Sequence, residues 1–311
     1  MACPIVPNRC LFPALIIFII LFSAEGLVGW ELGSGVLHPA NLNPVRLKQA
    51  KAIFERSGST NEDFSVIAPD GVELHGWKIR AHSPNGDWLL LFHGVSDNRT
   101  GDLGHAEILL RNGYSVVMMD SRAHGESGGD MATYGWKEKY DTVAVVKELY
   151  SQEHVRHLGA LGVSMGAAIA LQSAAVEPSI QAVIAEDPFS DLREVSYDYA
   201  GLHFSPFLGE TLFRPASIFA LNGMARAGGF PPDEVSPEKA VAARAFSVLL
   251  ICGTRDKVIP CRHARKIYEA ARGPKELWIV QGAGHAAALG YAPEEYENRI
   301  VRFLTDSYSA R

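Results

Sequence analysis

Residues 158–176 read LGALGVSMGAAIALQSAAV, and this stretch decides the fold. The apolar run His157 to Val163 has the composition of a buried strand, and the small and aliphatic run Met165 to Val176 has that of a buried helix. Between them lies a G-x-S-x-G motif, Gly162-Val163-Ser164-Met165-Gly166, in a strand–turn–helix setting. The glycines leave room for a sharp turn that exposes the serine hydroxyl, and the helix N-terminus favours developing negative charge. The motif therefore predicts Ser164 as a nucleophile.

A serine hydroxyl is a weak nucleophile at neutral pH and needs a base, for which His285 is the candidate. It stands in Gly282-Ala283-Gly284-His285, just after an apolar run that ends at Val280. The imidazole in turn needs a carboxylate on its other ring nitrogen. Asp256 follows the apolar run that ends at Cys252. We predict that Ser164, Asp256 and His285 form a catalytic triad.

Attack on a carbonyl group creates an oxyanion, which requires two backbone N–H donors. One expected donor is the amide of Met165, the residue after the nucleophile. The second is expected from the loop that begins Leu91-Phe92-His93-Gly94-Val95, and we assign it to the amide of Val95. His93 is interpreted as a structural residue rather than a proton carrier.

Strand-like and helix-like runs alternate along most of the chain. The strand-like runs are Phe64 to Ala68, Val72 to Arg80, Trp88 to Phe92, Tyr114 to Met119, His157 to Val163, Ile180 to Ala185, Val248 to Ile251 and Glu276 to Val280. The helical patterns cover Asp102 to Asn112, Tyr134 to Tyr150, Met165 to Val176, Arg262 to Ala271 and Pro293 to Leu304. This order predicts an α/β fold with a mostly parallel eight-stranded sheet and helices on both faces. The first two runs flank Pro69-Asp70-Gly71 and predict an antiparallel hairpin at one edge.

The alternation breaks in a segment rich in phenylalanine, leucine and proline, at about residues 188–245. A stretch of this length without a clear strand is too long for a plain loop. We expect a helical insertion over the carboxyl edge of the sheet, which would act as a lid. The alternative is a set of helices that cover the core without contact to substrate.

The motifs together resemble the serine α/β-hydrolase superfamily from about Asn61 to the C-terminus. The resemblance rests on His93-Gly94, the G-x-S-x-G motif, Gly253-Thr254-Arg255-Asp256 and Gly282-Ala283-Gly284-His285. It is closest in layout to lipase-, esterase- or thioesterase-like branches that carry an N-terminal membrane anchor, and to acylaminoacyl-peptidase-like ones. It implies an α/β-hydrolase fold over residues 61–311 and acyl transfer through an acyl-enzyme on Ser164. It implies no metal or organic cofactor.

The resemblance and the apolar insertion favour hydrolysis of carboxylic esters with small to medium apolar acyl groups. One alternative is a peptidase of the prolyl-oligopeptidase or aminopeptidase type, in which Glu186, Asp187 or Glu210 could anchor a peptide terminus. Another is an acyl thioesterase, and a third is a non-catalytic binding module on the same scaffold.

The first 30 residues differ from the rest, because Cys10 to Ala24 carries no charge. We interpret residues 1–30 as a signal peptide or a membrane anchor, with membrane association through residues 10–30, and a buried core helix as the alternative. Arg9 precedes the apolar stretch, so the positive-inside rule predicts an exported or anchored protein with its catalytic domain outside the cytoplasm. Residues 31–60 are expected to form a linker and a short amphipathic helix.

The composition is that of a globular protein, with 47% hydrophobic and 21% charged residues. The net charge of −6 argues against nucleic acid as a partner, because phosphate binding needs clustered lysine and arginine. Four cysteines in 311 residues do not make a disulfide framework. Cys252 and Cys261 could pair in an oxidising compartment, but we expect two separate small residues there. The partner that remains is a small ester or acyl substrate.

Overall fold

The computed structural model describes residues 37–39, 45–202 and 204–309. The predicted signal or anchor segment, residues 1–30, lies outside the described residues, as do residues 31–36 and 40–44 of the linker. No helix among the described residues has both the length and the apolar character needed to span a bilayer.

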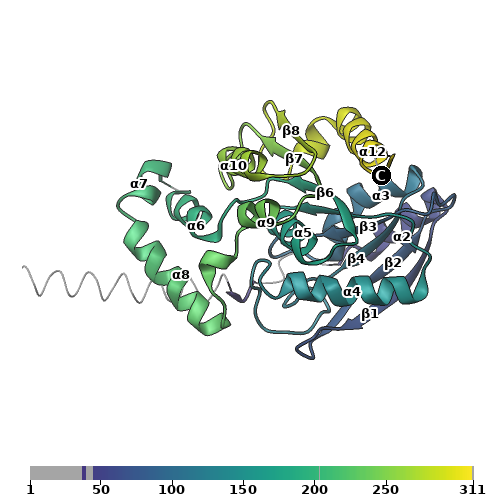
Figure 1. Ribbon diagram of the computed structural model, residues 1–311, viewed down its shortest axis with the longest axis horizontal. Helices are drawn as coiled ribbons and strands as arrows, with labels where there is room; N and C mark the ends of the chain where they lie inside the picture. The colour runs from purple at the N-terminus through teal and green to yellow at the C-terminus, as the bar shows by residue number, and fades with distance from the viewer. Residues whose placement is uncertain (1–36, 40–44, 203, 310–311) are drawn as a thin grey trace, which may run out of the picture.

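An eight-stranded sheet forms the centre of the molecule (Figure 1). Its strands run in the order β1-β2-β4-β3-β5-β6-β7-β8, with β2 antiparallel to both β1 and β4 and the other pairs parallel. The strands are β1 (Thr60–Ile67), β2 (Glu73–Arg80), β3 (Trp88–Phe92), β4 (Ser115–Met119), β5 (Leu158–Val163), β6 (Ile180–Glu186), β7 (Ser247–Gly253) and β8 (Lys275–Val280). The predicted mostly parallel sheet with a hairpin edge is confirmed.

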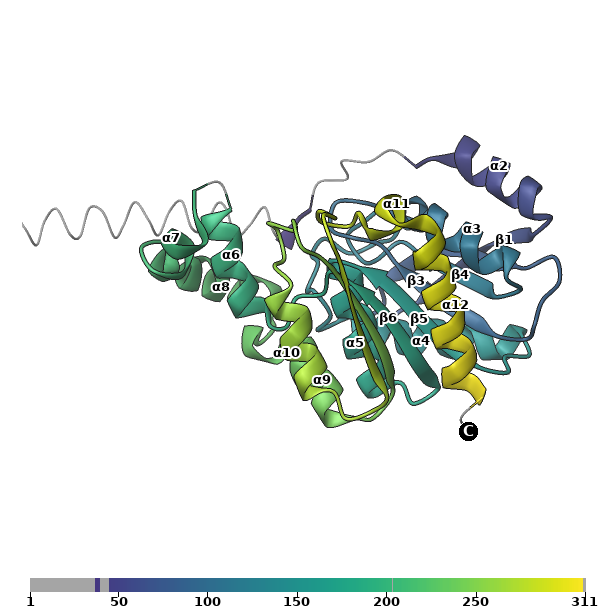
Figure 2. The ribbon, with the colours of Figure 1, turned by 90° about the horizontal axis from the view of Figure 1, so that it is seen from above.

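Helices cover both faces of the sheet, as Figures 1 and 2 show. The helices outside the insertion are α2 (Leu47–Ser57), η1 (Arg99–Asp102), α3 (Leu103–Arg111), α4 (Glu138–Gln152), α5 (Met165–Val176), α10 (Arg262–Ala270), α11 (Ala288–Tyr291) and α12 (Pro293–Ser309). Side chains alternate between the two faces of a strand, so β3 contributes side chains to two cores, one on each face of the sheet. Leu90 packs in the core shared with α4 and α5, whereas Leu89 and Leu91 pack in the core shared with α3 and α12.

The helix after β4 begins later than its sequence pattern predicts. The pattern extends from Tyr134, whereas α4 begins at Glu138. Tyr134 has a positive φ of 56°, which a helix does not allow, and the Glu138 carboxylate accepts hydrogen bonds from the amides of Thr133 and Gly135. The Glu138 side chain therefore holds the turn that precedes α4, and the helix begins only after this turn.

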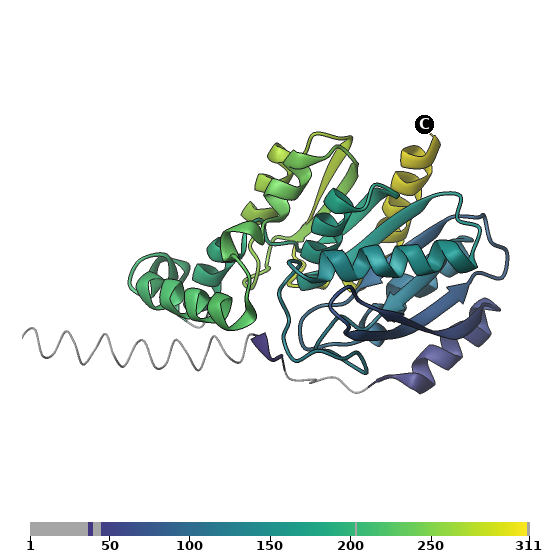
Figure 3. The same cartoon turned by 60° about the horizontal axis from the view of Figure 1, so that its bottom comes forward.

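Between β6 and β7 the chain forms a helical insertion, as the sequence predicts. It contains α6 (Leu192–Gly201), α7 (Pro206–Glu210), α8 (Arg214–Gly228), η2 (Pro232–Glu234) and α9 (Pro237–Ala243), with no strand among its described residues. Proline occupies the first turn of α7, α8 and α9, where its missing N–H costs nothing. Figures 2 and 3 show α6, α7 and α8 standing beyond one end of the sheet. The role of the insertion as a lid stays a prediction.

Polar side chains attach the insertion to α10. Asp198 of α6 accepts a hydrogen bond from the imidazole of His263 at 2.7 Å, and both side chains are buried. The Lys266 ammonium also binds the Glu194 carboxylate of α6 at 2.6 Å. Because His263 and Lys266 both lie on α10, these contacts attach α6 to the helix that follows β7.

Cys252 and Cys261 form a disulfide, so the prediction of two separate cysteines is wrong. Cys252 lies in β7 and Cys261 directly precedes α10. The intervening loop turns back on itself and places the two Cα atoms 5.5 Å apart. That separation lies within the usual range for a disulfide.

Candidate active site

Ser164 occupies a sharp turn between β5 and α5. Its backbone has a φ of 57° and a ψ of −118°, which are unusual for a residue with a side chain. The turn brings backbone so close that a Cβ on Gly162 would lie 2.3 Å from the carbonyl oxygen of Gly166. A Cβ on Gly166 would lie 1.9 Å from the carbonyl oxygen of Phe92. Both motif glycines are therefore required by sterics.

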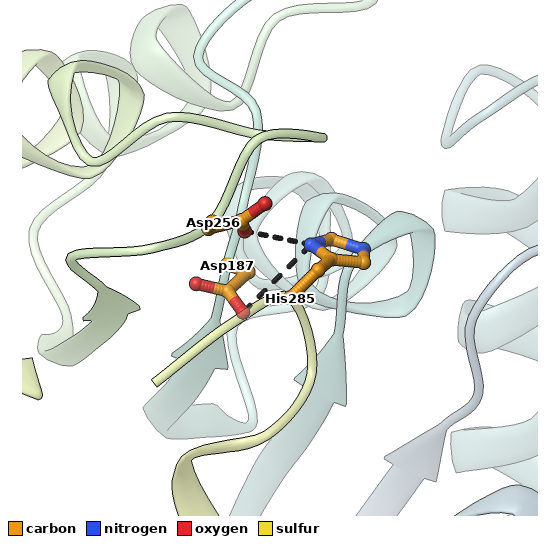
Figure 4. Close-up of side chains that lie close together, drawn as sticks. All are labelled: Asp187, Asp256 and His285. Carbon is orange, nitrogen blue, oxygen red and sulfur yellow. Dashed lines mark hydrogen bonds and ion pairs between the residues drawn. The ribbon is translucent and has the colours of Figure 1, made fainter. Parts of the chain in front are cut away.

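The structure brings the side chains of Ser164, His285 and Asp256 together, in the arrangement that the sequence predicts. His285 Nε2 lies 2.9 Å from Ser164 Oγ, and His285 Nδ1 lies 2.7 Å from Asp256 Oδ2. A carboxylate only accepts hydrogen bonds, so Nδ1–H donates to Asp256 and Nε2 is free to accept from the serine hydroxyl. Figure 4 shows Asp256 and His285 in this contact.

Asp256 is itself held by backbone. Its Oδ1 accepts hydrogen bonds from the amides of Val258 at 2.7 Å and Ile259 at 2.9 Å. These contacts leave Oδ2 directed at the imidazole of His285. The loop after β7 therefore presents the carboxylate in a fixed orientation.

The surroundings of His285 favour its protonated form. Burial acts to lower the pKa of the imidazole, but the hydrogen bond and charge of Asp256, together with the charges of Asp187 and Glu186, raise it above its ordinary value. A base with a raised pKa accepts a proton more readily from a serine hydroxyl.

A second carboxylate lies behind the imidazole, as Figure 4 shows. Asp187 Oδ2 is 3.8 Å from His285 Nδ1, and its side chain is 1% exposed. Burial and the charges of Asp256 and Glu186 raise the pKa of Asp187 to about 8. From the sequence, the only role predicted for Asp187 is to anchor a peptide terminus in the alternative peptidase. Its position directly after β6, between the strands that precede Ser164 and Asp256, is the signal that could have placed it here.

The residues assigned to the oxyanion hole lie beside the nucleophile. Met165 opens α5, where backbone N–H groups have no partner within the helix. A Cβ on Gly94 would lie 3.8 Å from Ser164 Cβ, so the loop that carries Val95 passes close to the serine. His93 holds this loop, because Nε2 accepts a hydrogen bond from the Ser121 amide and Nδ1–H donates to the Gly94 carbonyl oxygen. Donation by Val95 and Met165 to a substrate oxyanion stays a prediction.

Asp187, Asp256 and His285 also bring three metal-ligating groups, two carboxylates and an imidazole, within 4.8 Å of one another. However, the Nδ1 proton of His285 is engaged by Asp256 and Nε2 by Ser164. A metal ion bound to this imidazole would have to displace one of these partners. The contacts fit proton transfer, and the prediction that no cofactor is needed stays a prediction.

The fold and the site define a serine α/β-hydrolase, an enzyme class that comparisons with known proteins support. Residues 47–215, just over half of the chain, match the family model of the X-Pro dipeptidyl-peptidase (S15 family). The chain belongs to this family. The matched residues include Ser164 and end before β7, so Asp256 and His285 lie outside the match.

Similarity to individual proteins also covers the C-terminal part of the chain. The protein YqkD of Bacillus subtilis is 28% identical over 302 residues, which cover 92% of this chain and 96% of YqkD. The esterase Pf2001 of Pyrococcus furiosus has 27% identity and a TM-score of 0.66, with 81% of this chain and 95% of the esterase covered. An acylaminoacyl peptidase of Pyrococcus horikoshii shares the fold, with 17% identity, a TM-score of 0.61 and coverage of 82% of this chain and 42% of the peptidase.

Proposed function

We propose that the protein hydrolyses carboxylic esters with small to medium apolar acyl groups through an acyl-enzyme on Ser164. The observation that carries the proposal is the continuous chain of hydrogen bonds from Ser164 Oγ through His285 to Asp256, at 2.9 Å and 2.7 Å. The likeness to the esterase Pf2001 supports an ester as the substrate.

The geometry supports a two-step acyl transfer. Ser164 Oγ attacks the ester carbonyl carbon while His285 Nε2 takes the hydroxyl proton, and Asp256 stabilises the imidazolium that forms. The amides of Met165 and Val95 bind the oxyanion of the tetrahedral intermediate. As the intermediate collapses, His285 gives the proton to the departing alcohol. Water then attacks the acyl-enzyme with His285 as base, and the acid is released as Ser164 regains its proton.

The insertion supports an apolar acyl group. Partial burial and the charge of the triad carboxylate Asp256 raise the pKa of Tyr199, a side chain of α6 in this insertion. Large apolar side chains remain exposed in the same segment, at Phe204, Phe207, Leu212 and Phe219. An acyl chain that covers such surface gains about 0.8 kcal/mol per buried methylene. A thioester would use the same machinery with a thiol as leaving group.

A peptidase is the second candidate, because the family is named for X-Pro dipeptidyl-peptidases. An aminopeptidase needs an acidic group for the peptide ammonium. The side chains of Glu186 and Asp187 are 1% exposed and bind backbone amides, so they are not open to a substrate. Glu210 is exposed and lies 3.1 Å from the Arg262 guanidinium. These contacts favour the esterase over the peptidase.

The test is turnover of nitrophenyl esters and thioesters of graded chain length by the full chain. We expect hydrolysis that is abolished in Ser164→Ala and in His285→Ala. Asp256→Asn should lower kcat on the order of ten-thousand-fold, because the amide no longer sets the tautomer of the imidazole.

Two outcomes would contradict the proposal. Cleavage of X-Pro or aminoacyl nitroanilides with no ester turnover would show a peptidase. A well-folded wild type that a fluorophosphonate probe does not label at Ser164 would show a binding module.

We also propose that the catalytic domain works in an oxidising compartment outside the cytoplasm. The Cys252–Cys261 disulfide supports this proposal, because such bonds persist in oxidising environments. Fractionation of cells that express the full chain, followed by thiol labelling, tests it. A reduced Cys252 in a cytoplasmic fraction would contradict it. Membrane association through residues 10–30 stays a prediction.

A further inference from the structure

The end of β6 contacts all three loops that carry the proposed triad. The carbonyl oxygen of Glu186 accepts a hydrogen bond from the Ser164 amide at 2.8 Å. Asp187 Oδ1 accepts from the amide of Gly253 at 3.2 Å, at the start of the loop that bears Asp256. β6 is also the sheet neighbour of both β5 and β7, so its last residues lie between the nucleophile and the acid.

The same two residues hold the histidine loop by its backbone. Asp187 Oδ2 accepts from the Ala286 amide at 2.7 Å, and Glu186 Oε1 accepts from the Ala288 amide at 2.9 Å. Ala286 has a positive φ of 54°, so this turn is strained and needs outside support. Both carboxylates are 1% exposed, and a buried carboxylate that accepts backbone hydrogen bonds orients them strongly.

We propose that Glu186 and Asp187 are positioning residues of this hydrolase, which hold the 285–288 turn so that the His285 imidazole stays within reach of Ser164 and Asp256. The proposal rests on the proposed function of the triad. Neither side chain contacts the nucleophile oxygen. Both act through His285. A catalytic side chain must be held within about 0.5 Å of its productive position.

Several titratable groups act electrostatically on His285, on Glu186 and Asp187, or on the groups next to them. The groups are Asp256 on the loop after β7, Tyr199 on α6, His105 on α3, Asp102 at the end of η1 and Tyr296 on α12. The charge of Asp187 is one of those that raise the pKa of His285. Because the pKa of Asp187 is itself raised to about 8, this charge is small at the acid pH where kcat/KM declines, so the acid limb should move little in the Asp187 variants.

The experiment compares Asp187→Ala, Asp187→Asn and Glu186→Gln in the full chain, with kinetics normalised to active sites titrated by a fluorophosphonate probe. Asp187→Ala should lower kcat roughly a hundredfold with KM little changed, since misplacement of the base affects the reacting geometry. Asp187→Asn keeps one acceptor oxygen, so it should recover about tenfold of that loss. Its acid limb should lie close to that of the wild type.

Asp87→Asn is the matched control, because Asp87 is a buried carboxylate that directly precedes β3, at the amino end of a strand, whereas the triad residues follow the carboxyl ends of theirs. It should lower Tm but leave kcat per titrated site and the pH profile unchanged. The proposal is overturned if the Asp187 variants behave like Asp87→Asn. If Asp187→Ala does not fold, the comparison of Asp187→Asn and Glu186→Gln with Asp87→Asn still tests the proposal.

The probe separates this proposal from the proposed function. If the wild type is labelled at Ser164 but cleaves no ester, the ester proposal fails, and the labelling rate constant replaces kcat in the same comparison. A wild type that is not labelled overturns both proposals.

Discussion

Strained backbone conformations are concentrated at and next to the residues of the proposed triad. Among the described residues, six that are not glycine have a positive φ, and three of these are Ser164, Asp187 and Ala286. Each such conformation costs on the order of 1–3 kcal/mol and persists only where surrounding contacts determine it. The hydrogen bonds from Ser164 to Glu186 and from Ala286 to Asp187 are contacts of this kind. The site is therefore maintained by its neighbours rather than by local preference.

Behind the site lies a buried histidine that the sequence analysis did not single out. His105 Nδ1 is 3.4 Å from the Asp102 carboxylate, and Nε2 is 3.6 Å from that of Glu186. Burial opposes a charged ring, but these two carboxylates together raise the pKa of His105 to about 9. The surroundings of His105 therefore favour its charged form at neutral pH.

This charge predicts a pH dependence of stability. The folded pKa of about 9 lies above the ordinary value of 6.5, so the contribution of charged His105 is complete below about pH 6.5 and is lost as the pH rises toward 9. We expect His105→Phe to lower Tm more at pH 6 than at pH 9, because the charged ring contributes fully only at the lower pH. Thermal unfolding of both proteins across this range is the measurement. Equal losses at the two pH values would show that the ring is neutral when folded.

At the scale of elements, the disulfide closes the loop that carries Asp256. Cys252 and Cys261 are nine residues apart in sequence, and Asp256 lies between them. The bond ties the end of β7 to the start of α10, the helix that also binds α6. One covalent link therefore restrains both the triad carboxylate and the anchor of the insertion.

Loss of this bond should affect stability and activity together. Closing a loop of this size contributes roughly 2.5–3 kcal/mol in the chain-entropy model, so Cys252→Ser with Cys261→Ser should lower Tm by about 5 °C. We also expect a several-fold lower kcat, because the Asp256 loop gains freedom. Calorimetry and ester turnover, with and without reductant, measure both effects. A wild type that is insensitive to reductant in both assays would contradict the expectation.

At the scale of the whole molecule, the insertion presents an exposed apolar surface. Phe204, Phe207 and Leu212 have exposed fractions of 71%, 72% and 67%, and they lie within nine residues of one another. We interpret this surface as the contact region for the apolar acyl group of the proposed substrate. Burial and the charge of the triad carboxylate Asp256 raise the pKa of Tyr199, on the adjoining helix α6.

The apolar surface predicts a loss of chain-length preference when it is made polar. In Phe207→Ser with Leu212→Ser, the gain in kcat/KM per added methylene, about fourfold at 0.8 kcal/mol, should shrink toward one. Turnover of acetyl esters should stay unchanged. Ile67→Ser is the control, since Ile67 is 62% exposed on the edge strand β1. If chain-length preference is the same in all three proteins, the insertion does not bind the acyl group.

Much of the fold could be predicted because it depends on local patterns. Apolar runs such as Trp88 to Phe92 can be buried only in a covered strand, and the two motif glycines allow only a close turn around Ser164. The three triad positions could be predicted for a related reason. Each follows an apolar run, and the carboxyl ends of parallel strands meet at one edge.

The pairing of Cys252 with Cys261 and the contacts of Asp187 with the loops that carry Asp256 and His285 could not be predicted in this way. The first depends on how the loop between the two cysteines bends back. The second depends on hydrogen bonds from Gly253 and Ala286, which are 66 and 99 residues away in sequence. Neither contact leaves a trace in local hydropathy.

The sequence by itself determined the succession of strands and helices, the serine turn and the three side chains that should meet there, because periodicity and steric demands are properties of neighbouring residues. Only the tertiary structure decided that the end of β6 supports the histidine turn, that two cysteines bond and that the insertion is anchored on α10. These features are distances between residues far apart in the chain, and such distances are set when all the elements pack against one another.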